Sequence, residues 1–154
     1  MVTSIILLNK MHDDIVIIYT DGACRGNPGI GGWAARIEYR GNYKDIYGFV
    51  SYTTNNQMEL LAVIEALKVL NRKCNVIVYT DSQYVQKGIT QWIHGFKMRN
   101  WRNVKNIELW QELDKLNNNH NITWNWVRGH SGDIKNDYVD RLANKAIDDN
   151  LNNL

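Results

Sequence analysis

Two carboxylates stand directly after two similar apolar segments of the chain. Ile-Tyr-Thr precedes Asp21 in a run that begins at Ile15, and Val-Tyr-Thr precedes Asp81 in the run 76–80. Continuous runs of β-branched and aromatic residues are typical of strands that are covered on both faces. We therefore expect each aspartate to lie just past the carboxyl end of a buried strand. Taken alone, either could instead be an aspartate that merely caps a turn or a helix.

Two more carboxylates belong to segments with helical periodicity. Glu59 lies near the start of a helix expected at Met58–Leu70, and Asp140 borders the apolar stripe of a helix expected from about Asp133 to Asp149. A surface glutamate near a helix N-terminus and a solvated boundary aspartate are the plainer interpretations of these two residues. Four converging carboxylates would repel each other strongly. A divalent cation between them would remove that repulsion.

Such a cluster would offer oxygen ligands only, which favours Mg²⁺ or Mn²⁺ over zinc. Two ions can clamp both the attacking and the leaving oxygen of a phosphoryl displacement, so the cluster predicts phosphodiester hydrolysis. His130 stands in the loop Gly129–Gly132 and is a candidate for proton transfer to or from water or the leaving group. A structural histidine in a turn is its plainer interpretation.

The segments between these residues have the order of an α/β domain. The pattern predicts an antiparallel meander with an irregular glycine-rich connection, the strands lying at 15–20, 33–39 and 43–50 and the connection at 24–32. It then predicts a helix, a strand, two helices, a strand and a last helix, at 58–70, 76–80, 84–96, 107–116, 122–127 and 133–149. The order β-β-β-α-β-α-α-β-α predicts an α/β fold with a five-stranded mixed sheet flanked by helices.

The first helix has a start signal and a clear topological role. Thr54 and Gln57 have the spacing of a capping box, in which Thr54 accepts a bond from the Gln57 amide and the Gln57 side chain reaches back. Because this helix joins two buried strands, we expect those strands to be parallel. As neighbours they would place Asp21 and Asp81 about 5 Å apart, at the edge where open α/β sheets bind ligands.

The composition is that of one globular domain. The chain has 154 residues, with 18 Lys and Arg against 16 Asp and Glu and a formal net charge of +2. Cys24 and Cys74 lack the spacing of a zinc site and are expected to be free thiols in a reducing cytosol. The apolar run Ile5–Leu8 is far shorter than a membrane span. We expect a cytoplasmic monomer with no membrane association and no obligate protein partner.

No linker or composition shift divides the middle of the chain. We expect an N-terminal extension at 1–13, one catalytic domain at 14–149 with a basic protrusion at about 92–106, and a C-terminal tail at 150–154. The glycine-rich stretch Gly22–Gly32 leads into a strand and lacks the Gly-Lys-Ser/Thr of a phosphate-binding loop. No nucleotide cofactor is therefore expected.

One segment is basic although the whole chain is nearly neutral. The stretch from Ser82 to Ile107 has no acidic residue and contains five cations, Lys87, Lys97, Arg99, Arg102 and Lys105. They alternate with Trp92, Phe96 and Trp101, a combination typical of surfaces that bind phosphates and stack on bases. A solvated basic helix that covers core aromatics explains the pattern equally well.

The motifs around these residues resemble a known family. They are Tyr-Thr-Asp21-Gly-Ala-Cys-Arg-Gly-Asn-Pro-Gly, Thr-Thr-Asn-Asn-Gln-Met-Glu59-Leu, Thr-Asp81-Ser-Gln-Tyr-Val and Trp-Val-Arg-Gly-His130-Ser-Gly. In order and spacing they resemble the ribonucleases HI of the bacterial type, in the ribonuclease H family. With Asn136–Leu142 added, the resemblance extends from about Asp14 to Ile147.

The resemblance implies a ribonuclease H-like fold and an endonuclease that hydrolyses the RNA strand of RNA–DNA hybrids, leaving 5′-phosphate and 3′-hydroxyl ends. It implies two Mg²⁺ ions, for which Mn²⁺ can substitute, a mobile proton-transfer residue at His130, and metal ligands at Asp21, Glu59, Asp81 and Asp140. Removal of R-loops and RNA primers is the expected task in the cell.

The resemblance also implies where the hybrid binds. The RNA strand and minor groove would contact Cys24, Asn27, Asn55, Asn56 and Gln83, where a 2′-hydroxyl distinguishes RNA from DNA. Thr54 would contact a phosphate of the DNA strand. The basic protrusion would hold the same strand through Trp92, Phe96, Lys97, Arg99, Trp101, Arg102 and Lys105.

The chain departs from the family pattern at three places. The protrusion lacks extra lysines that some members have, Phe96 stands where a tryptophan is often found, and Asp133 stands where some relatives have a histidine. Fewer cations predict a shallower salt dependence of hybrid binding than in a lysine-richer relative. Asp133 bears on the pH behaviour of the His130 loop.

Two other functions use the same fold. A non-catalytic module that binds hybrids would need a broken carboxylate set, whereas all four carboxylates are present. A nuclease that acts on DNA, as the resolvase and transposase relatives do, is disfavoured by the neutral amides of Asn55, Asn56 and Gln83. These groups suit sugar hydroxyls and base edges, although capping and turn chemistry explains the first two equally well.

Overall fold

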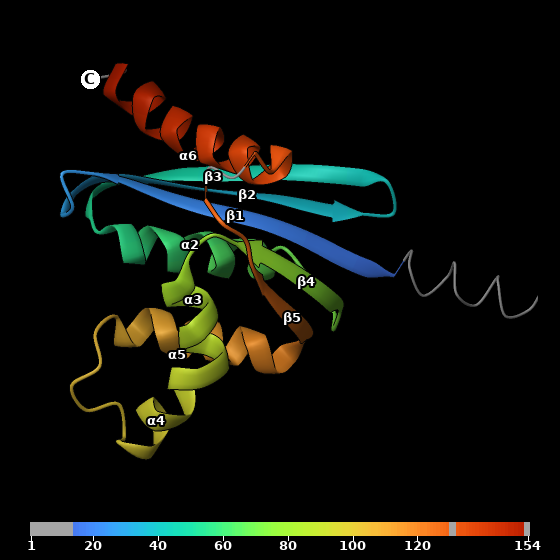
Figure 1. Cartoon of the computed structure of the whole chain (residues 1–154), viewed down its shortest axis with the longest axis vertical. Coiled ribbons are helices and arrows are strands. Elements are labelled where there is room, and N and C mark those ends of the chain that lie inside the picture. The colour runs from blue at the N-terminus through green and yellow to red at the C-terminus, as the bar shows by residue number, and fades with distance from the viewer. Residues whose placement is uncertain (1–13, 130–131, 153–154) are drawn as a thin grey trace, which may run out of the picture.

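A computed structural model of the chain describes residues 14–129 and 132–152. One five-stranded sheet has the strand order β3-β2-β1-β4-β5 (Figure 1). Its strands are β1 (Ile15–Arg25), β2 (Gly29–Tyr39), β3 (Asn42–Thr53), β4 (Asn75–Thr80) and β5 (Asn121–Trp126). The pairs β1–β2 and β2–β3 are antiparallel, whereas β1–β4 and β4–β5 are parallel. The expected α/β fold with a mixed sheet and a parallel β1–β4 pair is therefore confirmed.

Helices cover both faces of this sheet. They are α2 (Asn55–Lys68), α3 (Gln83–Lys87), the π-helical turn η1 (Gly88–Trp92), α4 (Ile93–Met98), α5 (Ile107–Asn119) and α6 (Ile134–Asn152). Figure 1 shows α6 alone along one face, with α2 and the group α3 to α5 on the other. Helix α6 continues to Asn152, three residues past its expected end at Asp149. Among the described residues, no helix has the length and apolar character needed to cross a membrane.

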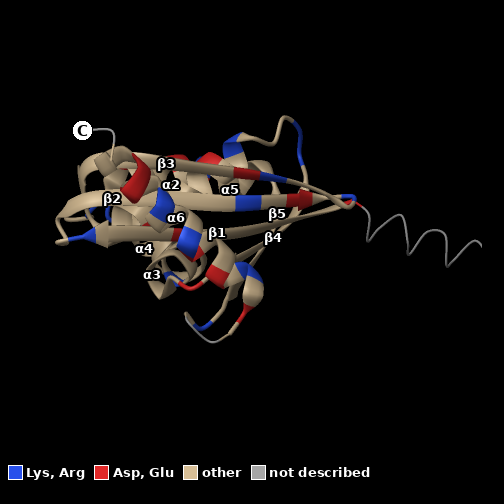
Figure 2. Cartoon of the chain, turned by 90° about the horizontal axis from the view of Figure 1, so that it is seen from above, with Lys and Arg blue, Asp and Glu red and all other residues tan. Residues whose placement is uncertain are grey.

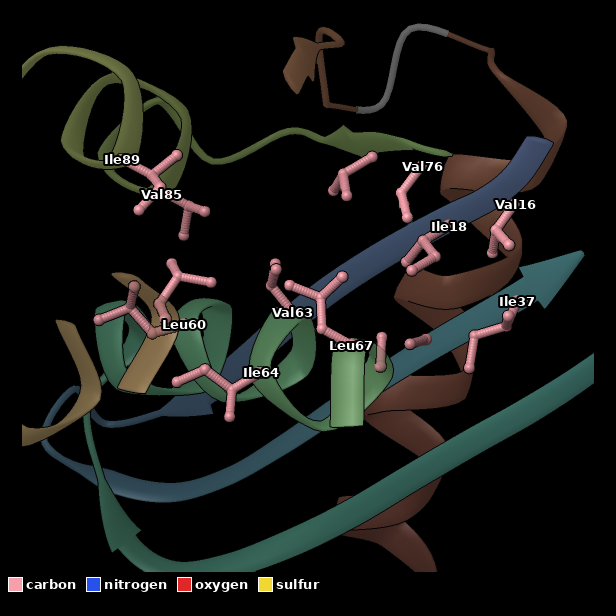
Figure 3. Packing of buried hydrophobic residues seen from close by; sticks show 14 of the residues in the cluster. Val16, Ile18, Ile37, Leu60, Val63, Ile64, Leu67, Val76, Val85 and Ile89 are labelled. Carbon is pink, nitrogen blue, oxygen red and sulfur yellow. The ribbon is translucent and has the colours of Figure 1, made fainter. Parts of the chain in front are cut away.

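The main core lies between the sheet and α2. Alternate residues of the central strands, such as Val16, Ile18 and Val78, are buried there. The facing side of α2 contributes Leu60, Val63, Ile64 and Leu67, and Figure 3 shows these side chains against the strands. Because both parts of this interface are apolar and closely packed, the core fixes the position of α2 along β1. The packing of α2 on the sheet therefore also positions the residues at the N-terminal end of this helix.

Strand β1 is longer than its sequence pattern indicates. The expected end at Thr20 is wrong, because β1 continues through Asp21 to Arg25 and pairs with β2 as far as Arg25 opposite Ile30. Of the glycines that suggested an irregular connection, Gly29, Gly31 and Gly32 lie within β2 and Gly26 lies in the turn before it; Gly31 and Gly32 allow close packing. A Cβ on Gly32 would lie 2.3 Å from the carbonyl oxygen of Ala143 in α6. Gly32 therefore allows α6 to pack closely on β2 and does not interrupt the strand.

The basic segment is helical over residues 83–98, with a change of pitch, and continues through turns to α5. The expected helix 84–96 is found as α3, η1 and α4 in succession, so a single regular α-helix is wrong. The middle turn starts at Gly88, which is packed against the buried indole of Trp110. A Cβ on Gly88 would lie 2.0 Å from Cη2 of that ring. The π-helical turn thus coincides with the closest contact between this segment and α5.

This contact predicts a large effect for a single methyl group. Gly88→Ala should lower the free energy of unfolding by about 1–3 kcal/mol, because the fully buried ring of Trp110 has no free space into which it can move. Gly95→Ala is the matched control, since a Cβ there meets nothing within 4 Å and removes only backbone freedom. Urea denaturation of both variants checks this. Equal stabilities of the two would contradict it.

Candidate active site

Asp21 and Asp81 lie side by side where the parallel pairing of β1 with β4 ends. Thr20 of β1 is in register with Thr80 of β4, so the two aspartates follow paired residues. Asp21 is only 2% exposed, and its Oδ1 accepts a hydrogen bond from the backbone N–H of Gly22 at 2.9 Å. The expectation that both aspartates meet at one edge of the sheet is confirmed.

The backbone around Asp81 is held by its neighbours. The Ser82 N–H donates to the Thr80 hydroxyl at 3.0 Å, and the indole N–H of Trp126 donates to the Asp81 carbonyl oxygen at 2.9 Å. Ser82 Oγ then caps α3 by accepting from the Val85 N–H at 3.1 Å. Asp81 itself therefore leaves the capping of α3 to Ser82, and its carboxylate is directed to the cluster.

Glu59 reaches the aspartates from the first turns of α2. Thr54 fixes the start of this helix, because its hydroxyl accepts from the Gln57 N–H at 3.2 Å. Gly22 allows the helix to come close, since a Cβ there would lie 2.5 Å from the Glu59 nitrogen. Carboxylate oxygens of Asp21, Glu59 and Asp81 consequently all lie within 4.8 Å of one another. Glu59 is 5% exposed.

Asp140 joins this group from the opposite face of the sheet. Helix α6 packs Val139 and Ala143 on Ala34 of β2, and Gly32 permits that close approach. After burial and the charges of Glu59 and Asp81, the Asp140 carboxyl group also contributes to the raised pKa of Asp21, although the group with oxygens within 4.8 Å consists of Asp21, Glu59 and Asp81 among the described residues. The four carboxylates singled out in the sequence thus come from β1, α2, the end of β4 and α6.

Burial and mutual repulsion make the ionised forms of Asp21 and Glu59 unfavourable. Burial is the main cause that raises the pKa of Asp21 far above the ordinary value, and the charges of Glu59 and Asp81 add to it. Burial likewise raises the pKa of Glu59, with a contribution from the charge of Asp81. The Oε2 atom of Glu59 is buried without a hydrogen-bond partner. A cation at this point would satisfy that oxygen and remove the repulsion, so these oxygen ligands fit a hard divalent metal ion.

His130 lies outside the described residues, as does Ser131. The residues on either side are described: a Cβ on Gly129 would lie 2.9 Å from Oδ2 of Asp81. After the loop, Asp133 caps α6, its Oδ1 accepting from the Lys135 and Asn136 N–H groups at 3.0 Å each, which confirms the expected start of this helix at about Asp133. The role of His130 in proton transfer stays a prediction.

Residues expected to contact the substrate lie in and next to the β1–β2 turn and at the N-terminus of α2, and hydrogen bonds connect these two parts of the chain. Asn27 Oδ1 accepts from the Asn55 N–H at 3.0 Å, and the Cys24 thiol donates to the Thr53 carbonyl oxygen at 3.3 Å. The side chains of Asn55 and Asn56 are exposed at this edge, and Gln83 is exposed at the start of α3. The structure thus joins Asn27 to Asn55 and Cys24 to Thr53, and Gln83 begins α3 two residues after Asp81.

The aromatic residues of the basic segment divide into two kinds. Phe96 and Trp101 pack on the main core, and the ring of Phe96 lies 5.8 Å from that of Trp110. Trp92 is 39% exposed, with its ring edge against Tyr84. For Phe96 and Trp101 the structure thus shows the core-packing alternative. Contact of any of the three with nucleic acid stays a prediction.

A chain of side-chain hydrogen bonds, which sequence patterns did not indicate, ties the basic segment to α2. Asn106 accepts from the Gln57 side chain at 3.1 Å and donates to the Tyr84 hydroxyl at 3.0 Å, and Trp110 donates to the same hydroxyl at 3.0 Å. Gln57 also accepts from the Thr53 hydroxyl at 2.7 Å. The predicted bond from the Gln57 side chain back to the start of the helix is therefore wrong, because the side-chain amide of Gln57 is hydrogen-bonded to Thr53 and Asn106. The left-handed φ of Asn106, +59°, is one that asparagine tolerates.

Comparison with known proteins places this arrangement in a family. The family model described as RNase H matches residues 13–148. The protein named Ribonuclease H of Francisella tularensis subsp. novicida is 56% identical over 137 residues, which cover 86% of this chain and 90% of that protein. Fold and site define a nuclease of the α/β class, and the chain belongs to the ribonuclease H family. It is accordingly a hydrolase.

Solved structures agree with this. A crystal structure of LC9-RNase H1, described as a type 1 RNase H with the type 2 active-site motif, superposes with a TM-score of 0.81 at 34% identity and covers 88% of this chain and 72% of that one. A structure of LC11-RNase H1 in complex with an RNA/DNA hybrid superposes with a TM-score of 0.66 at 26% identity, covering 88% and 99%. The ribonuclease H fold predicted from the motifs is therefore confirmed.

The carboxylate cluster predicts a pH-dependent stability in the absence of metal. A folded-state pKa of Asp21 above the unfolded value means that the folded chain holds more protons, so stability falls as the pH rises above about 4. Asp21→Asn removes this cost, and its gain in Tm over the unmodified chain should grow from pH 5 to pH 8 in EDTA. Thermal unfolding at several pH values measures it.

The control is Asp149→Asn, which removes an exposed carboxylate paired with Lys145 and should shift Tm little at any pH. Addition of Mg²⁺ should narrow the difference between Asp21→Asn and the unmodified chain, because only the complete cluster gains the binding energy. A difference in Tm that is independent of pH would show that Asp21 is ionised in the folded chain without cost.

Proposed function

We propose that this ribonuclease H cleaves the RNA strand of RNA–DNA hybrids by two-metal-ion hydrolysis and leaves 5′-phosphate and 3′-hydroxyl ends. The observation that carries the proposal is the convergence of Asp21, Glu59 and Asp81, with oxygens within 4.8 Å of one another, in a chain of this family. The similar LC11-RNase H1 forms a complex with an RNA/DNA hybrid.

In this proposal the protein supplies a rigid set of oxygen ligands. Asp21, Glu59, Asp81 and Asp140 would hold two Mg²⁺ ions, for which Mn²⁺ would substitute. When bound, the ions supply the positive charge that activates water and stabilises the leaving oxygen. The Gly22 N–H orients the Asp21 carboxylate, and the fixed start of α2 holds Glu59 against it. His130 would accept or deliver a proton at the water or at the leaving oxygen.

Recognition of the hybrid would use the two strands differently. The exposed amides of Asn55, Asn56 and Gln83, together with Cys24 and Asn27, would contact the RNA strand, where the 2′-hydroxyl marks RNA. Thr54 and the basic protrusion at 92–106 would bind phosphates of the DNA strand. The hydrogen bonds from Gln57 through Asn106 to Tyr84 would keep these two phosphate-binding parts at a fixed separation. In the cell, a cytoplasmic monomer would remove R-loops and RNA primers.

Strand-resolved cleavage tests this function. A hybrid with the RNA strand labelled should be cleaved only in the presence of Mg²⁺ or Mn²⁺, while single-stranded RNA, duplex RNA and duplex DNA stay intact. Asp21→Asn should lower the rate about 1000-fold or more, because a ligand to the ions that stabilise the transition state is lost. Asp149→Asn should cleave at the normal rate.

Each alternative function predicts a different result in the same assay. Tight hybrid binding without cleavage by the unmodified chain would indicate a non-catalytic binding module. Cleavage of duplex DNA would indicate a DNA-directed nuclease of the same fold. Analysis of the product ends checks the direction of hydrolysis, since 3′-phosphates would contradict the proposed chemistry.

The salt dependence of hybrid binding tests the basic protrusion. Lys97 Nζ lies 2.8 Å from Asp114 Oδ2, whereas no salt bridge of Lys105 occurs among residues 14–129 and 132–152. In catalytically inactive Asp21→Asn, Lys105→Ala should reduce the slope of log K against log salt by about 0.7–0.9. Lys97→Ala should reduce it less, because that charge is already partly neutralised. Equal reductions would contradict this distinction.

A further inference from the structure

Trp126 begins the motif Trp-Val-Arg-Gly-His130-Ser-Gly, and the proposed chemistry gives it no role. It is the last residue of β5, the strand at the edge of the sheet beside β4 (Figure 1). Trp126 is 42% exposed, yet its indole N–H donates to the Asp81 carbonyl oxygen at 2.9 Å. A bond that an exposed indole could make with water is made instead with the backbone of a residue of the carboxylate cluster.

A second tryptophan of β5 makes the same kind of bond at a different place. Side chains alternate between the two faces of a strand, so Trp124 and Trp126 share one face. The indole N–H of Trp124 donates to Asn117 Oδ1 of α5 at 3.0 Å, and its ring packs on the main core. The bond of Trp124 therefore joins two elements of the fold, whereas the bond of Trp126 ends on a residue of the carboxylate cluster.

Asp81 lies just beyond the paired part of its strand. The parallel pairing of β4 with β5 ends at Thr80 opposite Trp126, and the Val127 N–H donates to the Thr80 carbonyl oxygen at 2.9 Å. The next carbonyl oxygen along the chain, that of Asp81, accepts from the Trp126 side chain. The indole therefore extends the hydrogen bonding of β4 by one residue, at the point where the chain turns toward α3.

The segment that follows Trp126 also lies against the Asp81 carboxylate. A Cβ on Gly129 would lie 2.9 Å from Asp81 Oδ2, so residues 126–129 contact Asp81 at its carbonyl group and at its carboxylate. The peptide group and the side chain of Asp81 are attached to the same Cα atom, so a rotation of the one moves the other. Oxygens of a metal site must be placed within about 0.2 Å, and a bond that fixes the Asp81 peptide group therefore bears on metal binding.

We propose that Trp126 is a positioning residue for Asp81, whose carboxylate it holds, through the backbone, in the orientation that the metal ions require. The inference rests on the proposed function, because it gives Trp126 a part in the same metal site. In this role the indole contacts neither an ion nor the hybrid and acts only through Asp81. Without the donor, the Asp81 peptide group rotates more freely, and its carboxylate occupies the ligating orientation for a smaller fraction of the time.

Two variants of one strand test this. Trp126→Phe removes the donor and keeps an aromatic ring, and Trp124→Phe is the matched control on the same face of β5. Calorimetric titration of each full chain with Mn²⁺, without nucleic acid, measures metal affinity independently of cleavage. Trp126→Phe should raise the Kd for Mn²⁺ and lower kcat about tenfold each, because it frees a metal ligand, while KM for the hybrid changes by less than about twofold. Trp124→Phe should leave all three within about twofold, even where its Tm falls.

The dependence on Asp81 gives a second test. In a chain that already has Asp81→Asn, the further change Trp126→Phe should alter the Kd for Mn²⁺ by less than about twofold, because the carboxylate that the indole positions is gone. A full additional tenfold loss in this double variant would show that the indole acts by another route, and it would overturn the proposal.

Two other outcomes would also overturn it. An unchanged Kd and kcat in Trp126→Phe would show that the bond serves only the fold. A raised KM with unchanged kcat and Kd would assign the exposed ring to direct contact with the hybrid. Failure of the unmodified chain to cleave hybrids would instead refute the proposed function, and the titrations without nucleic acid would still decide whether Trp126 positions Asp81.

Discussion

Repulsion among the carboxylates buried around Asp21, within β1, is the constraint on which the rest of the structure depends. Asp21 and Glu59 are almost fully buried, and the oxygens of both lie within 4.8 Å of Asp81. Acids at such distances in a medium of low polarity separate or bind protons unless the scaffold prevents movement. The closely packed apolar core between α2 and the sheet is what prevents it. The same rigidity that costs stability without metal gives ready-made ligands to a cation.

Glycines let the elements that carry the acids come close enough. Gly22 admits the backbone of α2 beside Asp21, and Gly32 admits α6 beside β2. In both places the neighbouring atoms are largely backbone, which cannot rotate away as a long side chain would. The four acids thus depend on two backbone contacts as much as on their own identity. Figure 2, which looks onto the α6 face, shows acidic and basic residues interspersed there, in contrast to the purely acidic cluster.

Those parts of the fold that local patterns encode could be predicted from sequence. Two buried runs that each end in Thr-Asp, separated by a helix with a threonine cap, sufficed to place Asp21 beside Asp81 on parallel strands. The length of β1 could not be predicted, because the glycines of β2 signal a loop until α6, more than 100 residues later in the chain, is seen to pack on Gly32. The bonds of Asn106 were missed for the same reason, since Gln57 is 49 residues away. Periodicity reports on neighbours along the chain, whereas these contacts join distant segments.

In the basic segment, aromatic residues that pack on the core alternate with cations that are exposed to solvent. Its aromatic residues Phe96 of α4 and Trp101 lie on the core, while Arg102 and Lys105, which with Trp101 belong to the non-helical connection between α4 and α5, are exposed. The interpretation as core and the interpretation as nucleic-acid surface therefore do not exclude each other. With a net charge of only +2, the chain has little general attraction for a polyanion. The proposed binding of a hybrid would then depend on where the few exposed cations stand, and the Gln57–Asn106–Tyr84 bonds join that segment to α2, the helix that carries Glu59.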